Sequence, residues 1–289
     1  MEKELMDLHI HTNYSDGEKS PVGIYGMARV KRLSTFAITD HDSVLGAKQL
    51  EKMNIKDINF INGVELSAKC SFGQLHILGY DLDLNNTVFI NQLDELRLNS
   101  QYNLKLVIDI LYQSFNIRFN KNDIDKLFSL SRTVNRVDLA RLLVNYGVCS
   151  SVKEAFDKYL IVAHHKISDQ TKNLDVQEAI ELIHSASGIP VLAHNCTLKF
   201  DYRAALSDYV GELANMGLMG IEAYYSTFTP DQTNYSLLMA ERYNLLVSGG
   251  SDYHGPNVKK DIELATGIKH NLKIKQLSLV DYINKRRGL

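Results

Sequence analysis

The chain has 289 residues, of which 45% are apolar and 23% charged, and its formal net charge at pH 7 is -2. These values are typical of a globular protein and exclude a disordered or fibrous chain. The absence of an overall basic charge argues against long duplex nucleic acid as a partner, because such binding depends on clustered Lys and Arg. No segment approaches the roughly 20 consecutive apolar residues that span a bilayer, so no membrane partner is expected.

The cysteines and the N-terminus indicate a cellular compartment. Cys70, Cys149 and Cys196 are widely spaced and odd in number, which predicts neither a disulfide framework nor a cysteine-rich zinc site. The first residues, MEKELMDLHIHT, are charged and lack the apolar core of a signal peptide. We therefore expect a cytoplasmic protein, and nothing in the sequence indicates an obligate protein partner.

Short apolar runs with β-like composition recur along the chain. They cover residues 5–10, 35–39, 58–64, 75–78, 189–193, 220–223 and 245–248. Between several of them lie signals for the start of a helix, namely Ser20-Pro21, Asp175 with Glu178, and Thr229-Pro230 with Gln232. This alternation predicts an α/β fold with a largely parallel sheet, in which functional residues gather at the C-terminal ends of the strands.

Residues 85–172 break the alternation and have a mainly helical pattern. Leu104, Val107, Ile108 and Leu111 recur at helical spacing and predict one apolar helix face. Further helices are predicted over residues 122–128, 136–146 and 151–160, the last opening with a Ser-x-x-Glu capping box at Ser151. We interpret residues 85–172 as an inserted helical subdomain, and residues 1–84 and 173–289 as the domain that carries it.

Histidines and carboxylates cluster around the predicted strands. His9 and His11, two residues apart at the end of the first run, can face one ion, although such a pair alone is more often two ordinary histidines. His76 interrupts an apolar run and, taken alone, favours a buried histidine bonded to a backbone carbonyl. Further side chains of this kind directly follow apolar runs at Asp40-His41-Asp42, Glu65, His194, Glu222 and Asp252-Tyr253-His254. In total, six of the ten histidines lie at predicted strand ends, and this clustering indicates a metal site.

The residue types indicate which ions and which chemistry to expect. Imidazoles and carboxylates without thiolates suit Mn, Fe or Zn. There are more candidate ligands than one ion can use, so two or three divalent ions are expected. Such a cluster activates water as a metal-bound hydroxide, and its surplus positive charge favours an anionic substrate such as a phosphate ester. Asp40 is interpreted as a residue that orients histidines or assists proton transfer, or equally as a strand-end cap, and Glu222 is left outside the ligand set.

The candidate residues occur in ordered motifs along nearly the whole chain. These are His9-x-His11 with Ser15-Asp16-Gly17, Thr39-Asp40-His41-Asp42, Gly63-Val64-Glu65-Leu66-Ser67, His76-Ile77-Leu78-Gly79-Tyr80, Ala193-His194 and Ser251-Asp252-x-His254. With this set the sequence resembles the PHP (polymerase and histidinol phosphatase) superfamily, especially its stand-alone branch of nucleoside 3',5'-bisphosphate phosphatases and short-oligonucleotide phosphoesterases. The resemblance implies a distorted (β/α)7 barrel with a helical insertion.

The resemblance also implies a ligand set for each ion. One ion would be held by His9, His11, Glu65 and Asp252, a second by Glu65, His76 and His194, and a third by Asp16, His41 and His254. Glu65 and Asp252 would bridge ions or position the hydroxide, and are the expected catalytic residues.

The insertion departs from the pattern of the resembled branch, whose Arg-Pro-His motif helps to bind substrate phosphate. The aligned residues here are Arg136-Val137-Asp138. Arg136 is the predicted substrate-binding residue, because a guanidinium can clamp a phosphate. Asp138 would repel a phosphate and is interpreted as an exposed helix residue that pairs with Arg141. His164 and His165 are interpreted as surface histidines, with a contribution to substrate binding as the alternative.

The expected partner is a small phosphate ester, and short oligonucleotides are a second class. We expect hydrolysis of nucleoside phosphates such as 3',5'-bisphosphates, or of short oligonucleotide ends. The alternatives are a histidinol phosphatase, another metal-dependent hydrolase, or a metal-stabilised binding or regulatory module without turnover.

Overall fold

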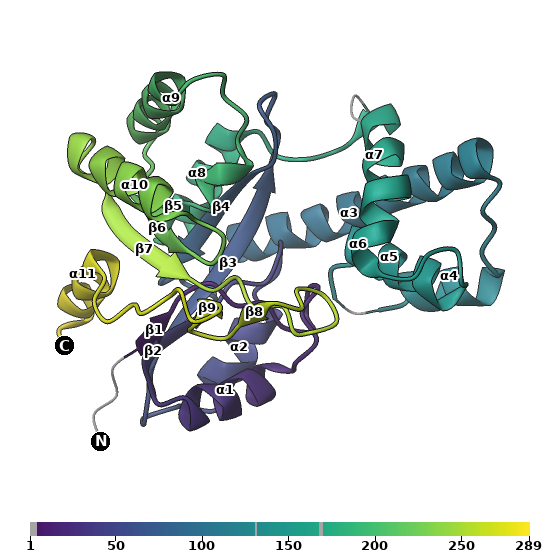
Figure 1. The fold of residues 1–289 in the computed structure, drawn as a ribbon. Coiled ribbons are helices and arrows are strands. Elements are labelled where there is room, and N and C mark those ends of the chain that lie inside the picture. Colours follow the sequence, from purple (N-terminus) through teal and green to yellow (C-terminus); the bar gives the residue numbers. More distant parts are fainter. Residues whose placement is uncertain (1–4, 131, 168–169) are drawn as a thin grey trace.

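A seven-stranded sheet forms the centre of the molecule (Figure 1). The computed structural model describes residues 5–130, 132–167 and 170–289 of the chain. The strands of the sheet lie side by side in sequence order. They are β1 (Leu5–Asp7), β2 (Leu33–Ile38), β3 (Asn59–Ala68), β4 (Leu75–Tyr80), β5 (Ile189–Leu192), β6 (Gly220–Tyr225) and β7 (Leu246–Gly250). Every predicted strand is therefore present, although β1 ends at Asp7 rather than at residue 10.

Strand β4 runs antiparallel to both of its neighbours, β3 and β5, whereas the other pairs are parallel. The N-terminal end of β4 therefore lies at the same edge of the sheet as the C-terminal ends of the other strands. His76 is the second residue of β4 and pairs in register with Ser67 of β3. A histidine near the start of this one strand thus faces the same edge as the residues that follow the parallel strands.

The sheet curls into a nearly closed barrel, which confirms the predicted fold class. The segments after β1 and β7 meet through backbone bonds from Leu8 N–H to Gly249 O (3.1 Å) and from Asp252 N–H to His9 O (2.8 Å). A Cβ atom on Gly250 would lie 2.3 Å from His9 N, so only glycine allows this approach.

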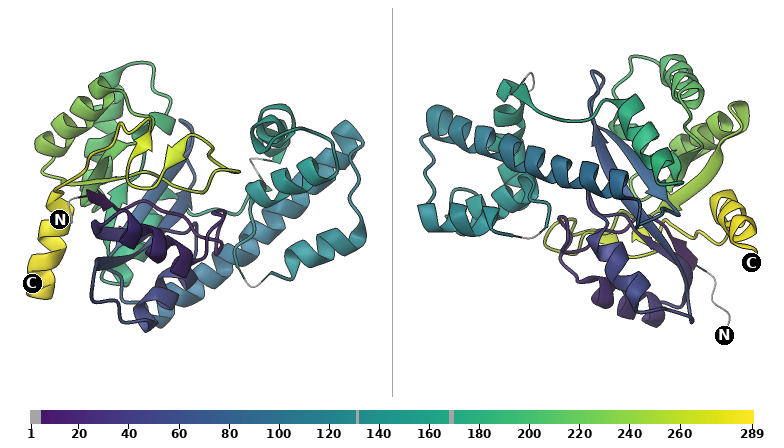
Figure 2. Two further views of the ribbon diagram at one scale, coloured as in Figure 1. Left: turned by 60° about the horizontal axis from the view of Figure 1, so that its bottom comes forward. Right: turned by 180° about the vertical axis from the view of Figure 1, so that it is seen from behind.

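Helices cover the outside of the barrel (Figures 1 and 2). They are α1 (Pro21–Val30), α2 (Leu45–Lys52), α8 (Val176–Ser185), α9 (Arg203–Asn215), α10 (Pro230–Arg242) and α11 (Ser278–Arg287). The predicted start signals are confirmed: Ser20 caps α1, and reciprocal capping boxes open α8 and α10. The short hairpin of β8 (Ile262–Glu263) and β9 (Gly267–Ile268) and the 3-10 turn η3 (Asn195–Thr197) were not predicted from the sequence.

The segment between β4 and α8 is helical and projects to one side of the barrel in both figures. It contains α3 (Thr87–Phe115), α4 (Lys121–Phe128), α5 (Arg136–Asn145), α6 (Val152–Ala155), the π-helical turn η1 (Phe156–Leu160) and α7 (Ile161–Ile167). The predicted capping box at Ser151 is only half correct, because the Glu154 carboxylate accepts hydrogen bonds from Ser150 instead of from the cap residue. No described helix, including the long α3, is apolar enough to cross a membrane.

Helix α3 belongs to two hydrophobic cores. Through Phe89, Leu93 and Leu96, its first half packs into the hydrophobic core that strands β3 and β4 share with α8. Its second half contributes Leu104, Val107 and Leu111 to a separate core formed with α5 and α7. The domain division at residues 85 and 172 stays a prediction.

Candidate metal centre

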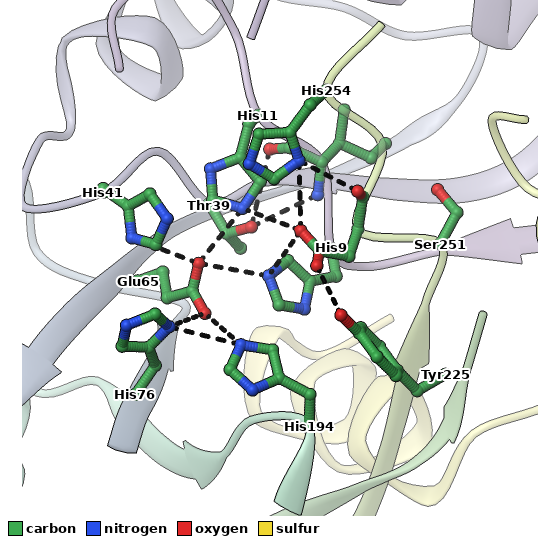
Figure 3. A network of polar contacts seen from close by, with 12 residues as sticks. His9, His11, Thr39, His41, Glu65, His76, His194, Tyr225, Ser251 and His254 are labelled. Atoms are coloured by element: carbon green, nitrogen blue, oxygen red, sulfur yellow. Dashed lines mark hydrogen bonds and ion pairs between the residues drawn. The ribbon is translucent and has the colours of Figure 1, made fainter. Parts of the chain in front are cut away.

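The structure brings all nine predicted ligands together at one edge of the barrel (Figure 3). Most of them follow a strand, as the sequence analysis expected, whereas Glu65 and His76 lie within β3 and β4. The nine residues are His9, His11, Asp16, His41, Glu65, His76, His194, Asp252 and His254.

Glu65 occupies the middle of this cluster (Figure 3). Its Oε2 atom lies 3.1 Å from His11 Nε2 and 3.3 Å from His9 Nε2. Its Oε1 atom lies 2.9 Å from both His76 Nδ1 and His194 Nε2. Since β3 is hydrogen-bonded on both sides and the side chain is 1% exposed, the sheet fixes where this carboxylate points.

The nine residues fall into four overlapping groups in which all donor atoms lie within 4.8 Å of one another. The groups are His11, Asp16, His41 and His254; His9, Glu65 and His194; His9, His11 and Asp252; and His41, Glu65 and His76. The first contains the set expected for the third ion, with His11 added. The sets expected for the other two ions divide among the remaining groups. Two or three ions therefore remain a proposal.

The donor atoms fit divalent ions. Three buried ring nitrogens lie near carboxylate oxygens but form no hydrogen bond among the described residues: His9 Nε2, His11 Nε2 and His41 Nδ1. A buried polar atom without a partner is costly, and an unprotonated imidazole nitrogen is a good ligand for Mn, Fe or Zn. Each of the three lies within 3.3 Å of Glu65 Oε2, so carboxylate and imidazole donors converge on the same small volume.

The electrostatics of the cluster favour positive charge. Burial alone would raise the pKa of Glu65, but His41, His9 and His76 outweigh it and hold that pKa well below its usual range. Burial would lower the pKa of His11, yet Asp252 and Glu65 raise it to about 9. Burial lowers the pKa of His41 to about 3, so its ring stays neutral and keeps a free lone pair.

Glu222 lies behind the cluster and belongs to none of its four groups. Its Oε1 atom lies 2.9 Å from His9 Nδ1, and its Oε2 atom accepts a hydrogen bond from His194 N–H at 2.8 Å. The first contact turns the other ring nitrogen of His9 toward Glu65, which is how outer residues orient metal-binding histidines.

Asp40 supports the loop that carries Asp16. It accepts hydrogen bonds from Thr12 N–H, Thr12 Oγ1 and Ser15 Oγ, each at 2.7 Å. Ser15 Oγ in turn lies 3.5 Å from His11 Nδ1, so Asp40 reaches a histidine only through a hydroxyl. Its predicted part in proton transfer stays a prediction.

Sequence reasoning missed two residues that contact Asp252. Tyr225 donates a hydrogen bond from its hydroxyl to Asp252 Oδ2 at 2.7 Å, and the Lys259 ammonium pairs with the same oxygen. Neither residue belongs to a sequence motif. Their contacts with Asp252 form only when β6 and the loop after β7 come together in the folded chain. Asp7 precedes the His9-x-His11 motif by two residues, and it accepts hydrogen bonds from Ser251 N–H (2.8 Å) and Oγ (2.6 Å).

The interpretation of Asp138 as an exposed residue is wrong, since it is only 6% exposed. Its carboxylate forms a two-point contact with Arg132, with Nη1 to Oδ2 at 2.8 Å and Nη2 to Oδ1 at 2.5 Å. The expected contact with Arg141 is also present, with 3.5 Å between Nη1 and Oδ1. The exposure was mispredicted because Arg132 precedes α5 and helical spacing does not reveal it.

Arg136, the predicted substrate-binding residue, is not among the residues that contact the cluster. Its guanidinium carbon lies 5.8 Å from the centre of the Phe156 ring, and it has no carboxylate partner among the described residues. Burial, Arg136 and His165 together lower the pKa of His164 to about 4. The surface interpretation therefore fits His165, which is exposed, better than His164, which is half-buried beside Arg136.

Comparisons with known proteins agree with this geometry. The PHP domain family model matches residues 7–248. The 5'-3' exoribonuclease Rnm of Escherichia coli is 28% identical over 260 residues, covering 87% of this chain and 86% of the relative. The 3',5'-nucleoside bisphosphate phosphatase of Chromobacterium violaceum is 26% identical over 254 residues, covering 87% of each chain. A crystal structure from Bifidobacterium adolescentis, assigned as a metal-dependent phosphoesterase, is 26% identical, has a TM-score of 0.77, and covers 97% of this chain and 96% of that one.

Proposed function

We propose that this chain acts on nucleoside phosphates such as 3',5'-bisphosphates or on the ends of short oligonucleotides. The chain belongs to the PHP domain family and is a metal-dependent phosphoesterase, a hydrolase. The observation that carries the proposal is the convergence of nine imidazole and carboxylate side chains, Glu65 among them, with three buried ring nitrogens that form no hydrogen bond among the described residues. The relatives named a bisphosphate phosphatase and an exoribonuclease support the nucleotide part of the proposal.

The chain's own residues divide the work around the ions. When bound, divalent ions supply an activated water and polarise the phosphoryl oxygens. The histidines and carboxylates of the cluster would hold those ions, with Glu65 shared between them. Glu65, Asp16 and Asp252 bring three negative charges, fewer than two divalent ions carry, so the site favours an anionic substrate.

Arg136 is our proposed contact for a phosphate beyond the cluster. A half-buried guanidinium without a carboxylate partner among the described residues retains its full donor fork for an anion. Asp138 does not compete there, because its oxygens are occupied by Arg132 and by the N-terminus of α5. A substrate with two phosphates, or with a phosphodiester next to the reacting end, would use both places.

The test is phosphate release by the manganese-loaded protein from matched substrates, each with and without chelator. Nucleoside 3'-phosphates, 5'-phosphates, 3',5'-bisphosphates, short oligonucleotides and histidinol phosphate form the panel. Chelator-sensitive turnover that is fastest for bisphosphates or oligonucleotides is the expected result. Faster turnover of histidinol phosphate would replace the nucleotide proposal.

The contribution of Arg136 is tested in the same assay. Arg136→Ala should raise KM for a bisphosphate about tenfold or more, with little change for a monophosphate, because only the former has a second phosphate to bind. Arg118→Ala is the matched control, since this exposed arginine of the same subdomain has its hydrogen bond and its cation–π contact with Tyr112, away from the cluster residues. Equal KM values for Arg136→Ala and the unmodified protein would remove Arg136 from the substrate site.

A further inference from the structure

The loop of residues 12–17 carries Asp16 and faces the helical insertion. Arg132 donates from Nη1 to the carbonyl oxygen of Ser15 at 2.9 Å, and Arg141 donates from Nη2 to the carbonyl oxygen of Asp16 at 2.8 Å. We infer that Arg132 and Arg141, oriented by Asp138, are positioning residues for the ion that Asp16, His41 and His254 would hold. This inference rests on the ion set of the proposed function, and it makes the insertion part of the metal centre.

Both arginines are themselves held in place. Asp138 binds Arg132 at two points and lies 3.5 Å from Arg141, and its own side chain is 4% exposed. Asp138 also accepts a hydrogen bond from Asn135 N–H at 3.0 Å as part of the capping box of α5. Two-point contacts between a guanidinium and a carboxylate fix direction as well as distance. The start of α5 is therefore linked through one carboxylate to two successive carbonyls of the loop.

The barrel holds the other side of the same loop. Asp40 accepts hydrogen bonds from Thr12 and Ser15, and Gly17 N–H donates to Thr12 O at 3.0 Å. A Cβ atom on Gly17 would lie 2.3 Å from His11 O, so the loop is already folded tightly on itself. Among the described hydrogen bonds, only the two arginines donate to the carbonyls of Ser15 and Asp16.

The orientation of the Ser15 and Asp16 peptides matters because the Asp16 carboxylate contacts three histidine rings at once. Its Oδ1 atom lies 3.2 Å from His254 Nε2 and 3.4 Å from His11 Nδ1, and its Oδ2 atom lies 3.8 Å from His41 Nε2. A rotation of the Ser15 or Asp16 peptide would swing the carboxylate away from these rings. The bonds from the insertion oppose that rotation, so they should set how tightly the ion is held.

A role in binding substrate phosphate fits Arg132 less well than a positioning role. Its Nη1 group already donates to Ser15 O, Thr133 O and Asp138, and its Nη2 group donates to Asp138. Few donors remain for a ligand. The Asp at position 138 therefore serves as the support for two arginines that face the metal loop.

The experiment is a manganese titration by calorimetry, with metal content measured after dialysis. It uses the full chain and the variants Asp138→Asn, Arg141→Ala and Arg141→Lys. We expect Asp138→Asn and Arg141→Ala to weaken the weakest manganese site about tenfold to hundredfold, or to lose one ion per chain, while tighter sites are unchanged. Arg141→Lys retains one donor and should recover part of the affinity. Arg118→Ala is the control and should bind as the unmodified protein does.

The readout separates this inference from the proposed substrate. Manganese binding is measured without turnover, so the result stays valid even if no substrate in the phosphate-release assay is hydrolysed. Equal manganese stoichiometry and affinity in all variants, checked as folded by circular dichroism, would overturn the inference. So would intact metal binding with a raised KM in Arg141→Ala, because that pattern assigns the arginine to substrate. If Asp138→Asn fails to fold, the comparison of Arg141→Ala with Arg141→Lys decides. An unmodified protein that binds neither manganese nor, in the same titration, iron or zinc would overturn the ion set itself.

Discussion

Replacing Glu222 by glutamine tests whether a residue behind the cluster controls it. The fully buried carboxylate contacts His9 Nδ1 through one oxygen and accepts from His194 N–H through the other. Glutamine has the same shape but only one acceptor oxygen, so one of the two contacts is lost and no negative charge remains. Loss of such a supporting contact typically weakens metal binding or activity 10- to 100-fold, which corresponds to about 1.4 to 2.8 kcal/mol.

The assay for Glu222→Gln combines manganese titration, phosphate release and urea unfolding of the metal-free protein. Because a buried donor loses its acceptor, the free energy of unfolding should also fall by about 1 to 3 kcal/mol. Glu241→Gln on the exposed side of α10 is the matched control and should change neither quantity. Unchanged metal affinity in a Glu222→Gln protein that is destabilised as expected would refute the orienting role. That outcome would leave Glu222 as a core residue only.

Three further changes test other parts of the structure. His9→Ala should abolish manganese loading and turnover with an unchanged far-ultraviolet circular dichroism spectrum, and surviving activity would refute the ligand set. Mainly because of burial, the pKa of His164 in the folded protein is lowered from its ordinary 6.5 to about 4, so the unfolded chain binds the proton more readily. Stability should therefore decline as pH falls from about 6.5 to 4, and urea midpoints of His164→Gln should decline less over that range. Phe89→Ala, at a fully buried position, should cost about 3 to 5 kcal/mol in urea unfolding, and a much smaller loss would show that α3 is weakly docked.

The strands and the clustering of the candidate ligands were predictable because each signal is local. An apolar run of β-like residues followed by a histidine or carboxylate fixes both a strand and the edge where its polar side chain emerges. His194 after β5 and His41 after β2 are examples, and both lie in the cluster. The direction of β4 was not predictable in this way. Only the hairpin pairing with β3 reveals that His76, at the start of its strand, belongs to the same edge.

The supporting contacts were harder to predict because they join segments that are distant in sequence. Tyr225 and Lys259 reach Asp252 from β6 and from the loop after β7, and neither residue has a spacing that marks it. The burial of Asp138 depends on Arg132, which lies outside the helix that carries Asp138. Such contacts follow from tertiary packing, which local periodicity does not encode.

The sharing of α3 between two cores has a consequence for how the protein unfolds. Phe89 and Leu93 lie in one core and Val107 and Leu111 in the other, on one uninterrupted helix of 29 residues. An isolated helix in water gains little from its own hydrogen bonds, so each half of α3 depends on the core that it enters. Loss of structure in either core would unwind the half of α3 that it holds, and the unwinding would spread along the helix into the other core. The two cores should therefore lose their structure in a single cooperative transition, with amide protons along α3 exchanging at similar rates.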